Sequence, residues 1–542
     1  MRKPKRIFVS TTLILTILLS GCQSTNSGKD NAGVDVQVEQ TGFPIVKEKI
    51  EMTIMAPHTG LAEWSDMPTI NDYEEKTNID LKFITPPMSD FGTRLNLAFA
   101  SEDLPDIIFG AGSSNLKSSM EIDYGSQGTL VALEDLIDKY APNIKKLLDE
   151  NPEIRKNITT PDGHIYSLPL ITDEDSAIWP RGPIWYNGEW LKALNVTELP
   201  KTVDEFYNLL VRFRDEDPNG NGKKDEIPLS DVKLDSSREW LMAAFGMKTR
   251  GIEEKNGEVR YTPVTEEYKA FLTFMNKLYK EKLLDQEVYS QADEQKKGKG
   301  QNNQLGVYPD WFSYFTSGKN ELEALEYPMW QPLTSEWSKE PVVPGSPKMV
   351  RGTFAITSKC VSPEAAIRWV DYFYSNEGFE YLNQGPEGVL WEYAENSEGE
   401  KVKVFTEKFK GKDNNEDERG KITPDYGIST PGYRTTLKGI KQDPNEKESE
   451  FNEFIKNETE AKITPYAEVP FPLVYLTKDQ QDKVAAVSTD LETYVEQMEA
   501  KFITGVEPLE NWDKYVKTIE SMNLKEYVDV YKTAYERWNK AE

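Results

Sequence analysis

From residue 50 onward, short apolar strands alternate with helix-length segments, and this alternation most limits the folds open to the chain. The predicted order is a strand over 52–56, a helix over 68–77, a strand over 79–84, a helix over 91–100 and a strand over 106–109. A β-α-β-α-β order implies a parallel sheet with right-handed crossovers. The 542 residues exceed what one hydrophobic core usually organises, so we predict an α/β fold of two lobes.

Further along, local signals place more elements. Thr202-Val-Asp-Glu205 is a capping box, and it opens a helix whose apolar residues recur at helical spacing. Additional predicted elements are a helix over 265–282, strands over 304–308 and 349–357, a helix starting at Ser362-Pro363 and a helical final eighty residues. The strongly charged stretches 394–420 and 438–462 are predicted to be exposed excursions.

The N-terminus carries a basic head, an apolar run over 7–19 and the sequence Leu19-Ser20-Gly21-Cys22. The run is shorter than the ~20 residues that span a bilayer as a helix, so it is typical of a secretory signal. The four residues resemble a bacterial lipobox, in which Cys22 is lipidated and becomes the new N-terminus. The alternative is an ordinary signal peptide that happens to contain a cysteine. We therefore predict a signal peptide over 1–21 and a lipidated, flexible tether over 22–48, because the latter is too polar to order itself.

Charge and composition argue against several classes of function. The formal charge is −28, and it becomes about −32 once residues 1–21 are removed, so we expect no binding to nucleic acid. Only two histidines occur, so the sequence does not favour histidine-based catalysis or a zinc site. Aromatic residues are plentiful, with 12 Trp, 26 Tyr and 22 Phe.

The segment 217–228 resembles a calcium loop. Oxygen-bearing side chains fall at loop positions 1, 3, 5, 9 and 10, Gly222 stands at position 6, and position 7 can offer a backbone carbonyl. The bidentate Glu of an EF-hand is missing from position 12, where Pro228 stands, and Glu226 is the nearest substitute. A solvated turn without metal is the alternative. Because the loop follows a helix directly, we expect a structural role for the ion.

Several segments together resemble a known family, the lipoprotein solute-binding proteins of bacterial carbohydrate ABC importers, in the group similar to alginate-binding and complex-glycan-binding proteins. They are 94–107, 199–206 with the metal loop behind it, 352–357 with 363–366, 385–391 and 502–513. The resemblance covers essentially the whole chain after Cys22, and the metal loop is its most specific element.

The resemblance implies a periplasmic-binding-protein-like fold of two α/β lobes joined by crossing hinge segments, with a mostly helical C-terminal part. Mapped onto this sequence, the first lobe is 49–172 plus 351–425, and the second is 173–350 plus 426–542. It also implies a structural Ca²⁺ bound by Asp217, Asn219, Asn221, Lys223 through its carbonyl, Asp225 and Glu226.

Sugar recognition needs aromatic rings for the C–H faces and planar polar groups for the hydroxyls. Candidates for this role follow strand ends, where α/β clefts bind ligands. They are Trp64, Trp179, Arg181, Trp240, Asp310, Trp311 and Trp391. Trp311 is the strongest, because its strand–Pro–Asp–Trp setting resembles the family's stacking position. Arg181 could pair a uronate or sulfate, so an acidic glycan is one alternative.

The leading hypothesis is a monomeric binding protein without chemistry of its own. It would be held by its lipid at the extracellular face of the plasma membrane, capture an oligosaccharide and deliver it to ABC transporter permease subunits. Two other classes stay open: a surface-anchored polysaccharide-degrading enzyme, and a sensor lipoprotein that presents a ligand to a membrane partner. A glycosidase needs a positioned pair of carboxylates, and no segment singles one out.

Overall fold

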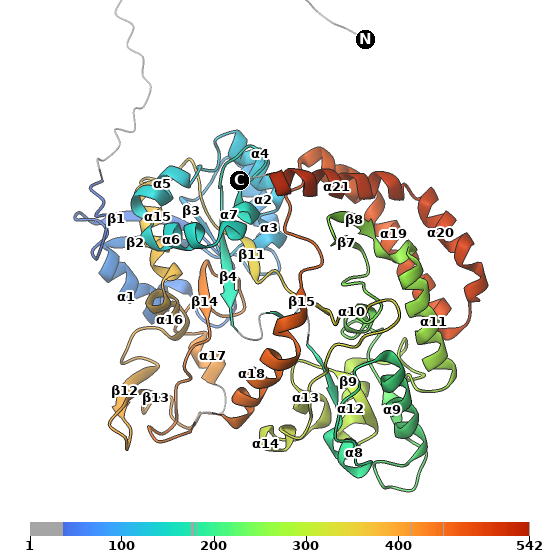
Figure 1. Ribbon diagram of the computed structural model, residues 1–542. Coiled ribbons are helices and arrows are strands. Elements are labelled where there is room, and N and C mark those ends of the chain that lie inside the picture. The colour runs from blue at the N-terminus through green and yellow to red at the C-terminus, as the bar shows by residue number, and fades with distance from the viewer. Residues whose placement is uncertain (1–35, 175–177, 180–181, 413–414, 448, 541–542) are drawn as a thin grey trace, which may run out of the picture. The chain divides into compact units, whose positions relative to one another are not determined.

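In the computed structural model (Figure 1), residues 36–174, 178–179, 182–412, 415–447 and 449–540 are described. The larger sheet has the strand order β14-β4-β11-β3-β1-β2. Its strands are β1 (Ile50–Met55), β2 (Ile79–Ile84), β3 (Ile107–Phe109), β4 (Leu168–Asp173), β11 (Met349–Ile356) and β14 (Gly432–Thr435). The predicted parallel pairing of β1 with β2 and β3 is confirmed. β11 returns from far along the chain and lies antiparallel between β3 and β4.

Successive side chains along these strands point to opposite faces of the sheet, so each face carries its own hydrophobic core. Met55, Ile108 and Ala355 share one core with the apolar residues of α2 (Phe91–Ser101). On the other face the Phe109 ring packs 5.8 Å from that of Trp369 in α15 (Pro363–Asp371), and Trp369 in turn contacts α1 (Pro68–Thr77). The larger sheet and the helices around it form the first half of the molecule. Its other helices are α3 (Gly112–Asn115), α4 (Ser118–Ser126), α5 (Glu134–Tyr140), α6 (Pro142–Glu150), α7 (Pro152–Ile158) and α16 (Asn376–Gln384).

A smaller sheet organises the second half, with the order β5-β9-β6. Its strands are β5 (Ile184–Tyr186), β6 (Ile227–Leu229) and β9 (Leu305–Pro309). Around it lie α8 (Gly188–Ala193), α9 (Val203–Asp215), α10 (Arg238–Ala243), α11 (Glu266–Lys280), α12 (Asp293–Gln301), α13 (Ser313–Ser317), α14 (Glu321–Ala324) and the hairpin β7 (Ile252–Lys255) and β8 (Glu258–Tyr261). The capping box is confirmed: the Thr202 hydroxyl accepts from the Glu205 amide, and the Glu205 carboxylate accepts from the Thr202 amide.

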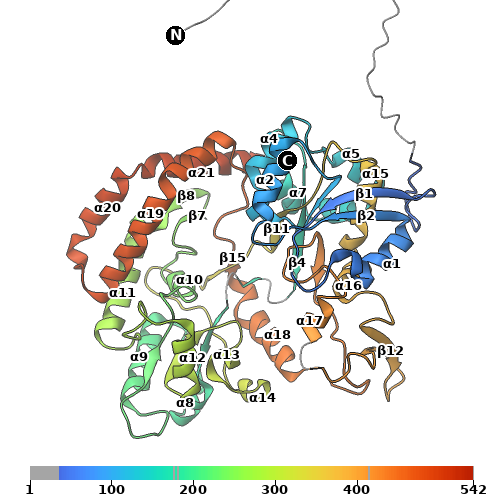
Figure 2. The ribbon, with the colours of Figure 1, turned by 180° about the vertical axis from the view of Figure 1, so that it is seen from behind.

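The helical C-terminal part is confirmed, and it completes the second core. α19 (Lys478–Thr504), α20 (Trp512–Ser521) and α21 (Leu524–Lys540) follow one another, and their apolar faces join the cluster around the smaller sheet. Figure 2 shows α19 lying beside α11. One expectation is wrong here: 438–462 is not simply an exposed excursion, because α18 (Glu450–Lys462) buries Phe451 and Ile455 in that core.

Several chain segments pass between the two sheets, and the boundaries differ in detail from those predicted. β14 pairs with β4, so the first half extends to residue 435 rather than 425. β10 (Val343–Pro344) and β15 (Ala467–Glu468) pair beside each other between the halves. The end of α21 also reaches the first half, where Trp538 Nε1 donates to Asn157 Oδ1 at 2.9 Å. The hairpin β12 (Trp391–Glu395) and β13 (Lys401–Phe405) and the short α17 (Asn415–Arg419) complete the elements.

The tether predicted for 22–48 ends earlier than expected. Ile45 and Val46 are fully buried, and Val38 forms a β-bridge with Val46. The backbone amides of Ile45 and Val46 donate to the Thr77 carbonyl, and these bonds attach the segment to the end of α1. Cys22 and the predicted signal peptide lie outside the described residues. Within those residues, no helix is both long and apolar enough to cross a bilayer.

Candidate functional site

The candidate site lies where the parallel strands of the smaller sheet end. β6 and β9 run parallel, and their carboxyl ends lead into Ser230-Asp231 and Asp310-Trp311. β5 is antiparallel to β9, so the residues before it, including Trp179, reach the same edge. Crevices outside the carboxyl ends of strands are the usual ligand sites of open α/β sheets. The structure therefore brings Trp179, Asp310 and Trp311 together.

Trp311 presents the open aromatic face of this site. Its side chain is 51% exposed, which is unusual for a tryptophan, whereas the neighbouring Trp179 is buried. The two ring centroids are 6.4 Å apart and the ring planes are inclined by 32°. The Trp179 ring thus supports Trp311 from beneath, and one face of Trp311 remains available to a ligand.

Asp310 is fixed by hydrogen bonds on both sides. Its Oδ1 accepts from the Trp311 amide at 2.8 Å, and its Oδ2 accepts from Thr316 Oγ1 at 2.7 Å. Its carbonyl accepts from Trp185 Nε1 at 2.9 Å. Gly182 packs so closely that an added Cβ would lie 2.5 Å from the Asp310 carbonyl carbon. The backbone that carries Trp311 is consequently held in place before any ligand arrives.

Sequence reasoning missed the rings that extend this surface. Phe315 of α13 is 45% exposed, and it contacts Phe312 and Tyr314 at centroid distances of 5.6 and 4.8 Å. Phe451 of α18 packs against Phe312 and Tyr314 from behind. The signal was present in the sequence, since four aromatic residues occur within 311–315. Phe451 was missed because its charged surroundings predicted an exposed stretch.

The other predicted ligand residues do not join this site. Trp64 is buried against Phe83 and Phe109 in the first half, so its ring has no open face. Trp391 is buried in a separate small cluster, donates Nε1 to the Gly385 carbonyl and lies beneath the Lys403 ammonium. The expectation that these two rings are open to a ligand is therefore wrong.

Trp240 takes an intermediate position. Trp240 is buried, yet it borders a small cavity of about 160 Å³ with Glu239, Lys248, Pro344 and Pro470. Its indole N–H is buried and has no acceptor among the described residues. Because Pro344 and Pro470 belong to the segments that cross between the halves, this cavity lies at the crossing. Arg181 lies outside the described residues.

The predicted calcium loop follows α9 directly, as expected. The amide nitrogens of Asn219 and Asn221 both donate to Asp225 Oδ1, at 3.2 and 3.0 Å. Glu226 Oε1 is buried without a hydrogen-bond partner among the described residues. Burial, followed by the charges of Asp217 and Asp225, raises the pKa of Glu226. Within the described residues, no three acidic, histidine or cysteine side chains are grouped as metal ligands.

Comparison with known proteins agrees with this architecture. The profile of the family described as bacterial extracellular solute-binding protein matches residues 58–378, more than half of the chain. The fructooligosaccharide ABC transporter substrate-binding protein FusA of Streptococcus pneumoniae is 26% identical over 98% of both chains.

Solved structures confirm the expected periplasmic-binding-protein-like fold. FusA in complex with kestose, and an EF-hand mutant of FusA in complex with fructo-nystose, each match with a TM-score of 0.66 over 91% of this chain and 100% of theirs. A solute-binding protein from Bifidobacterium longum infantis, described as binding HMO, matches with a TM-score of 0.71 at 22% identity, over 91% of this chain and 99% of its own.

Proposed function

The chain belongs to the bacterial extracellular solute-binding proteins, and from this membership we propose that it captures an oligosaccharide outside the cell and delivers it to an ABC importer. The observation that carries the proposal is the half-exposed Trp311 ring on a backbone fixed by Asp310. A flat ring suits the C–H face of a sugar, and the adjacent carboxylate can accept from its hydroxyls. FusA, which matches nearly the full length of the chain, is a fructooligosaccharide-binding protein and supports this substrate class.

We further propose that the ligand of this site is neutral. The carboxylate of Asp310 stands directly beside the exposed ring and would repel a uronate or sulfate. Its oxygens accept hydrogen bonds from within the protein, and they retain lone pairs for ligand hydroxyl donors. The relative's ligand kestose is also uncharged. The acidic-glycan alternative rested on Arg181, which lies outside the described residues.

Replacing Trp311 with Ala should weaken oligosaccharide binding about tenfold, because loss of ring contact costs roughly 1.5 kcal/mol. Isothermal titration with kestose and a panel of other neutral oligosaccharides measures this. Val506→Ala, which removes another exposed apolar side chain, is the control and should bind normally. Unchanged affinity in Trp311→Ala would remove this ring from the site.

Transport can be separated from enzyme action and from sensing. The protein should return labelled oligosaccharides unchanged after prolonged incubation, whereas an enzyme would cleave them. Reconstitution with the permease subunits should make uptake depend on the protein. A ligand response through a membrane kinase, without uptake, would favour the sensor.

We propose that Cys22 carries the lipid that holds the protein at the extracellular face of the membrane. Two or more acyl chains are needed for stable attachment, since each buried methylene contributes only about 0.8 kcal/mol. The protein would act as a monomer whose two halves close around the ligand. Mass spectrometry of the mature N-terminus tests the lipid, and Cys22→Ser should release the protein from the membrane.

We propose that the 217–226 loop binds a structural Ca²⁺ through the side chains of Asp217, Asn219, Asn221, Asp225 and Glu226 and the carbonyl of Lys223. The buried Glu226 oxygen, which has no partner among the described residues, supports a cation, as does the existence of an EF-hand mutant of the relative FusA. Calcium at about 100 times Kd should raise the free energy of unfolding by about 2.7 kcal/mol. Thermal melts with calcium and with chelator measure the change. An identical melt in both, together with no metal by elemental analysis, would reject the assignment, and Asp225→Asn should abolish any shift.

A further inference from the structure

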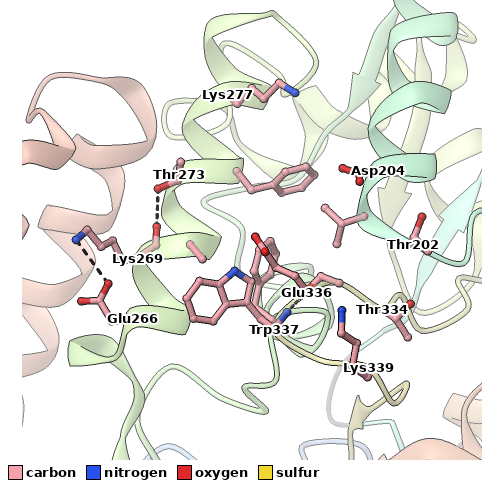
Figure 3. A pocket seen from close by; sticks show the side chains of 15 residues that line it. Thr202, Asp204, Glu266, Lys269, Thr273, Lys277, Thr334, Glu336, Trp337 and Lys339 are labelled. Atoms are coloured by element: carbon pink, nitrogen blue, oxygen red, sulfur yellow. Dashed lines mark hydrogen bonds and ion pairs between the residues drawn. The ribbon is translucent and has the colours of Figure 1, made fainter.

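A second hollow lies away from the Trp311 site and has a volume of about 910 Å³. Figure 3 shows its three walls: the first turn of α9 with Thr202 and Asp204, the face of α11 from Glu266 to Lys277, and the segment 334–339. The hollow is not lined by any residue of the Trp311 surface, which consists of Trp179, Asp310, Trp311, Phe312, Tyr314 and Phe315. The volume falls within the range of small-molecule sites.

The hollow contains an exposed tryptophan on a fixed segment. Trp337 is 40% exposed, and Phe245 and Phe274 line the hollow with their ring centroids 5.8 Å apart. The Trp337 amide donates to Ser335 Oγ at 3.0 Å, and Ser335 Oγ donates to the Ala244 carbonyl at 2.7 Å. These bonds anchor the segment without using the indole, so the ring is positioned by its backbone and stays open.

The charges around the hollow balance, although the chain as a whole carries −28. Its lining includes three carboxylates, Asp204, Glu266 and Glu336, and three ammonium groups, Lys269, Lys277 and Lys339. Glu266 pairs with Lys269 at 3.6 Å, and the Lys277 ammonium lies 3.5 Å from the centroid of the Tyr207 ring.

The remaining three charged groups are available to a ligand. No hydrogen bond or ion pair joins the side chains of Asp204, Glu336 and Lys339 to other described residues, and all three residues are exposed. In Figure 3 the Lys339 ammonium points up toward the hollow between Trp337 and Thr334.

This lining limits the chemistry of the ligand. An anion would meet three carboxylates and a cation three ammonium groups, so neither sign is favoured. A wholly apolar molecule would strip water from charged groups without replacing their hydrogen bonds. A ligand with flat C–H faces and many hydroxyls satisfies both parts of the lining, because its faces cover the rings while its hydroxyls bond to Asp204, Glu336 and Lys339.

We propose that this hollow is a second binding site for neutral carbohydrate, with Trp337 as its stacking ring. The site lies outside the Trp311 surface, so it would hold a separate sugar or a distant part of a longer glycan. It would raise the local concentration of glycan at the protein by adding a second point of attachment.

Fluorine NMR of the full chain tests the proposal directly. The 12 tryptophans are replaced by 5-fluorotryptophan, and the Trp337 and Trp311 resonances are assigned from W337F and W311F. The probes are kestose, maltotriose, cellotriose and xylotriose, each up to about 10 mM, which detects Kd values into the millimolar range. At least one should shift the Trp337 resonance saturably, and Lys339→Ala should raise its Kd about fivefold or more. A Trp337 resonance that none of the probes moves would overturn the proposal.

The two sites are distinguished in the same spectra. In Trp311→Ala the Trp337 shift should persist with the same Kd, which shows that the hollow acts independently. A shift of Trp311 alone would reject the second site and leave the proposed function intact. A shift of Trp337 alone would support the second site and count against the Trp311 site of the proposed function. Trigalacturonic acid is the charged control, and a stronger Trp337 shift with this anion than with the neutral sugars would contradict the neutral class.

Discussion

Replacing Glu499 with alanine should lower the free energy of unfolding by about 3–5 kcal/mol, because it leaves buried arginines without their counter-charge. Glu499 of α19 is 1% exposed. Its Oε1 accepts from Arg238 Nε at 2.9 Å and from Arg250 at 3.1 Å, and its Oε2 accepts from the Tyr268 hydroxyl at 2.6 Å. One carboxylate thus joins α19 to α10, to α11 and to the residues before β7. Urea unfolding at pH 7 measures the loss.

The control for this variant is Glu496→Ala, one turn earlier on the exposed face of the same helix, which should cost little. The pH dependence gives a second check. Burial alone would raise the pKa of Glu499, but the charges of Arg238 and Arg250 lower it below its ordinary value. The stabilisation is therefore fully present above the ordinary glutamate pKa and is lost only as pH falls through the lowered value. Equal stability of the variant and the wild type at pH 7 would show that the network contributes nothing.

Replacing Gly182 with alanine should weaken oligosaccharide binding by more than tenfold. The added Cβ would lie 2.5 Å from the Asp310 carbonyl carbon and 2.6 Å from the Trp311 nitrogen. Backbone cannot yield as a flexible side chain does, so the strand end must move at a cost of about 1–3 kcal/mol. The Trp311 ring moves with it. Isothermal titration with the best ligand of the panel measures the affinity.

Gly298→Ala provides the matched control for this substitution. Gly298 lies in α12, and a Cβ built there meets no atom within 4 Å. This variant should bind normally and gain up to about 1 kcal/mol in stability, because alanine favours the helix. Normal affinity in Gly182→Ala would mean that the position of Asp310 and Trp311 does not control binding.

Local rules located the elements of the fold best where a capping group marks a beginning. The helix after Thr202 and the one after Ser362 start at the predicted residues, since in both a side-chain oxygen accepts from a backbone amide of the first turn. The strand at 79–84 also has the predicted bounds. These features depend on residues within a few positions of each other, which is the range over which sequence patterns carry information.

Long-range packing was harder to predict. In α20, Trp512, Val516 and Ile519 recur at helical spacing, but the structure buries Tyr515 and leaves Val516 only partly buried. The Tyr515 ring contacts Phe502 and Tyr494 of α19, and an aromatic ring contributes more buried area than valine. The face that a helix buries is thus decided partly by its neighbours in space.

The same limit applies to the candidate site. Trp64 and Trp311 both follow strands, and nothing near either residue reveals whether its ring is covered. Trp64 is covered by Phe109 and Phe83, whereas the segment around Trp311 leaves one face open. Coverage depends on chain that lies far away in sequence, so the residues alone could nominate the rings, and only the family resemblance singled out Trp311.

The position of β11 between β3 and β4 has a consequence for the order of folding. As the chain leaves the ribosome, β1, β2 and β3 emerge early, but their partner at 349–356 follows only after residues 110–348. Until then β3 presents an unpaired edge, which can pair with another chain and so promotes aggregation. The half that is synthesised first is therefore among the last to finish, and a nascent chain depends on protection of that edge until its partner arrives.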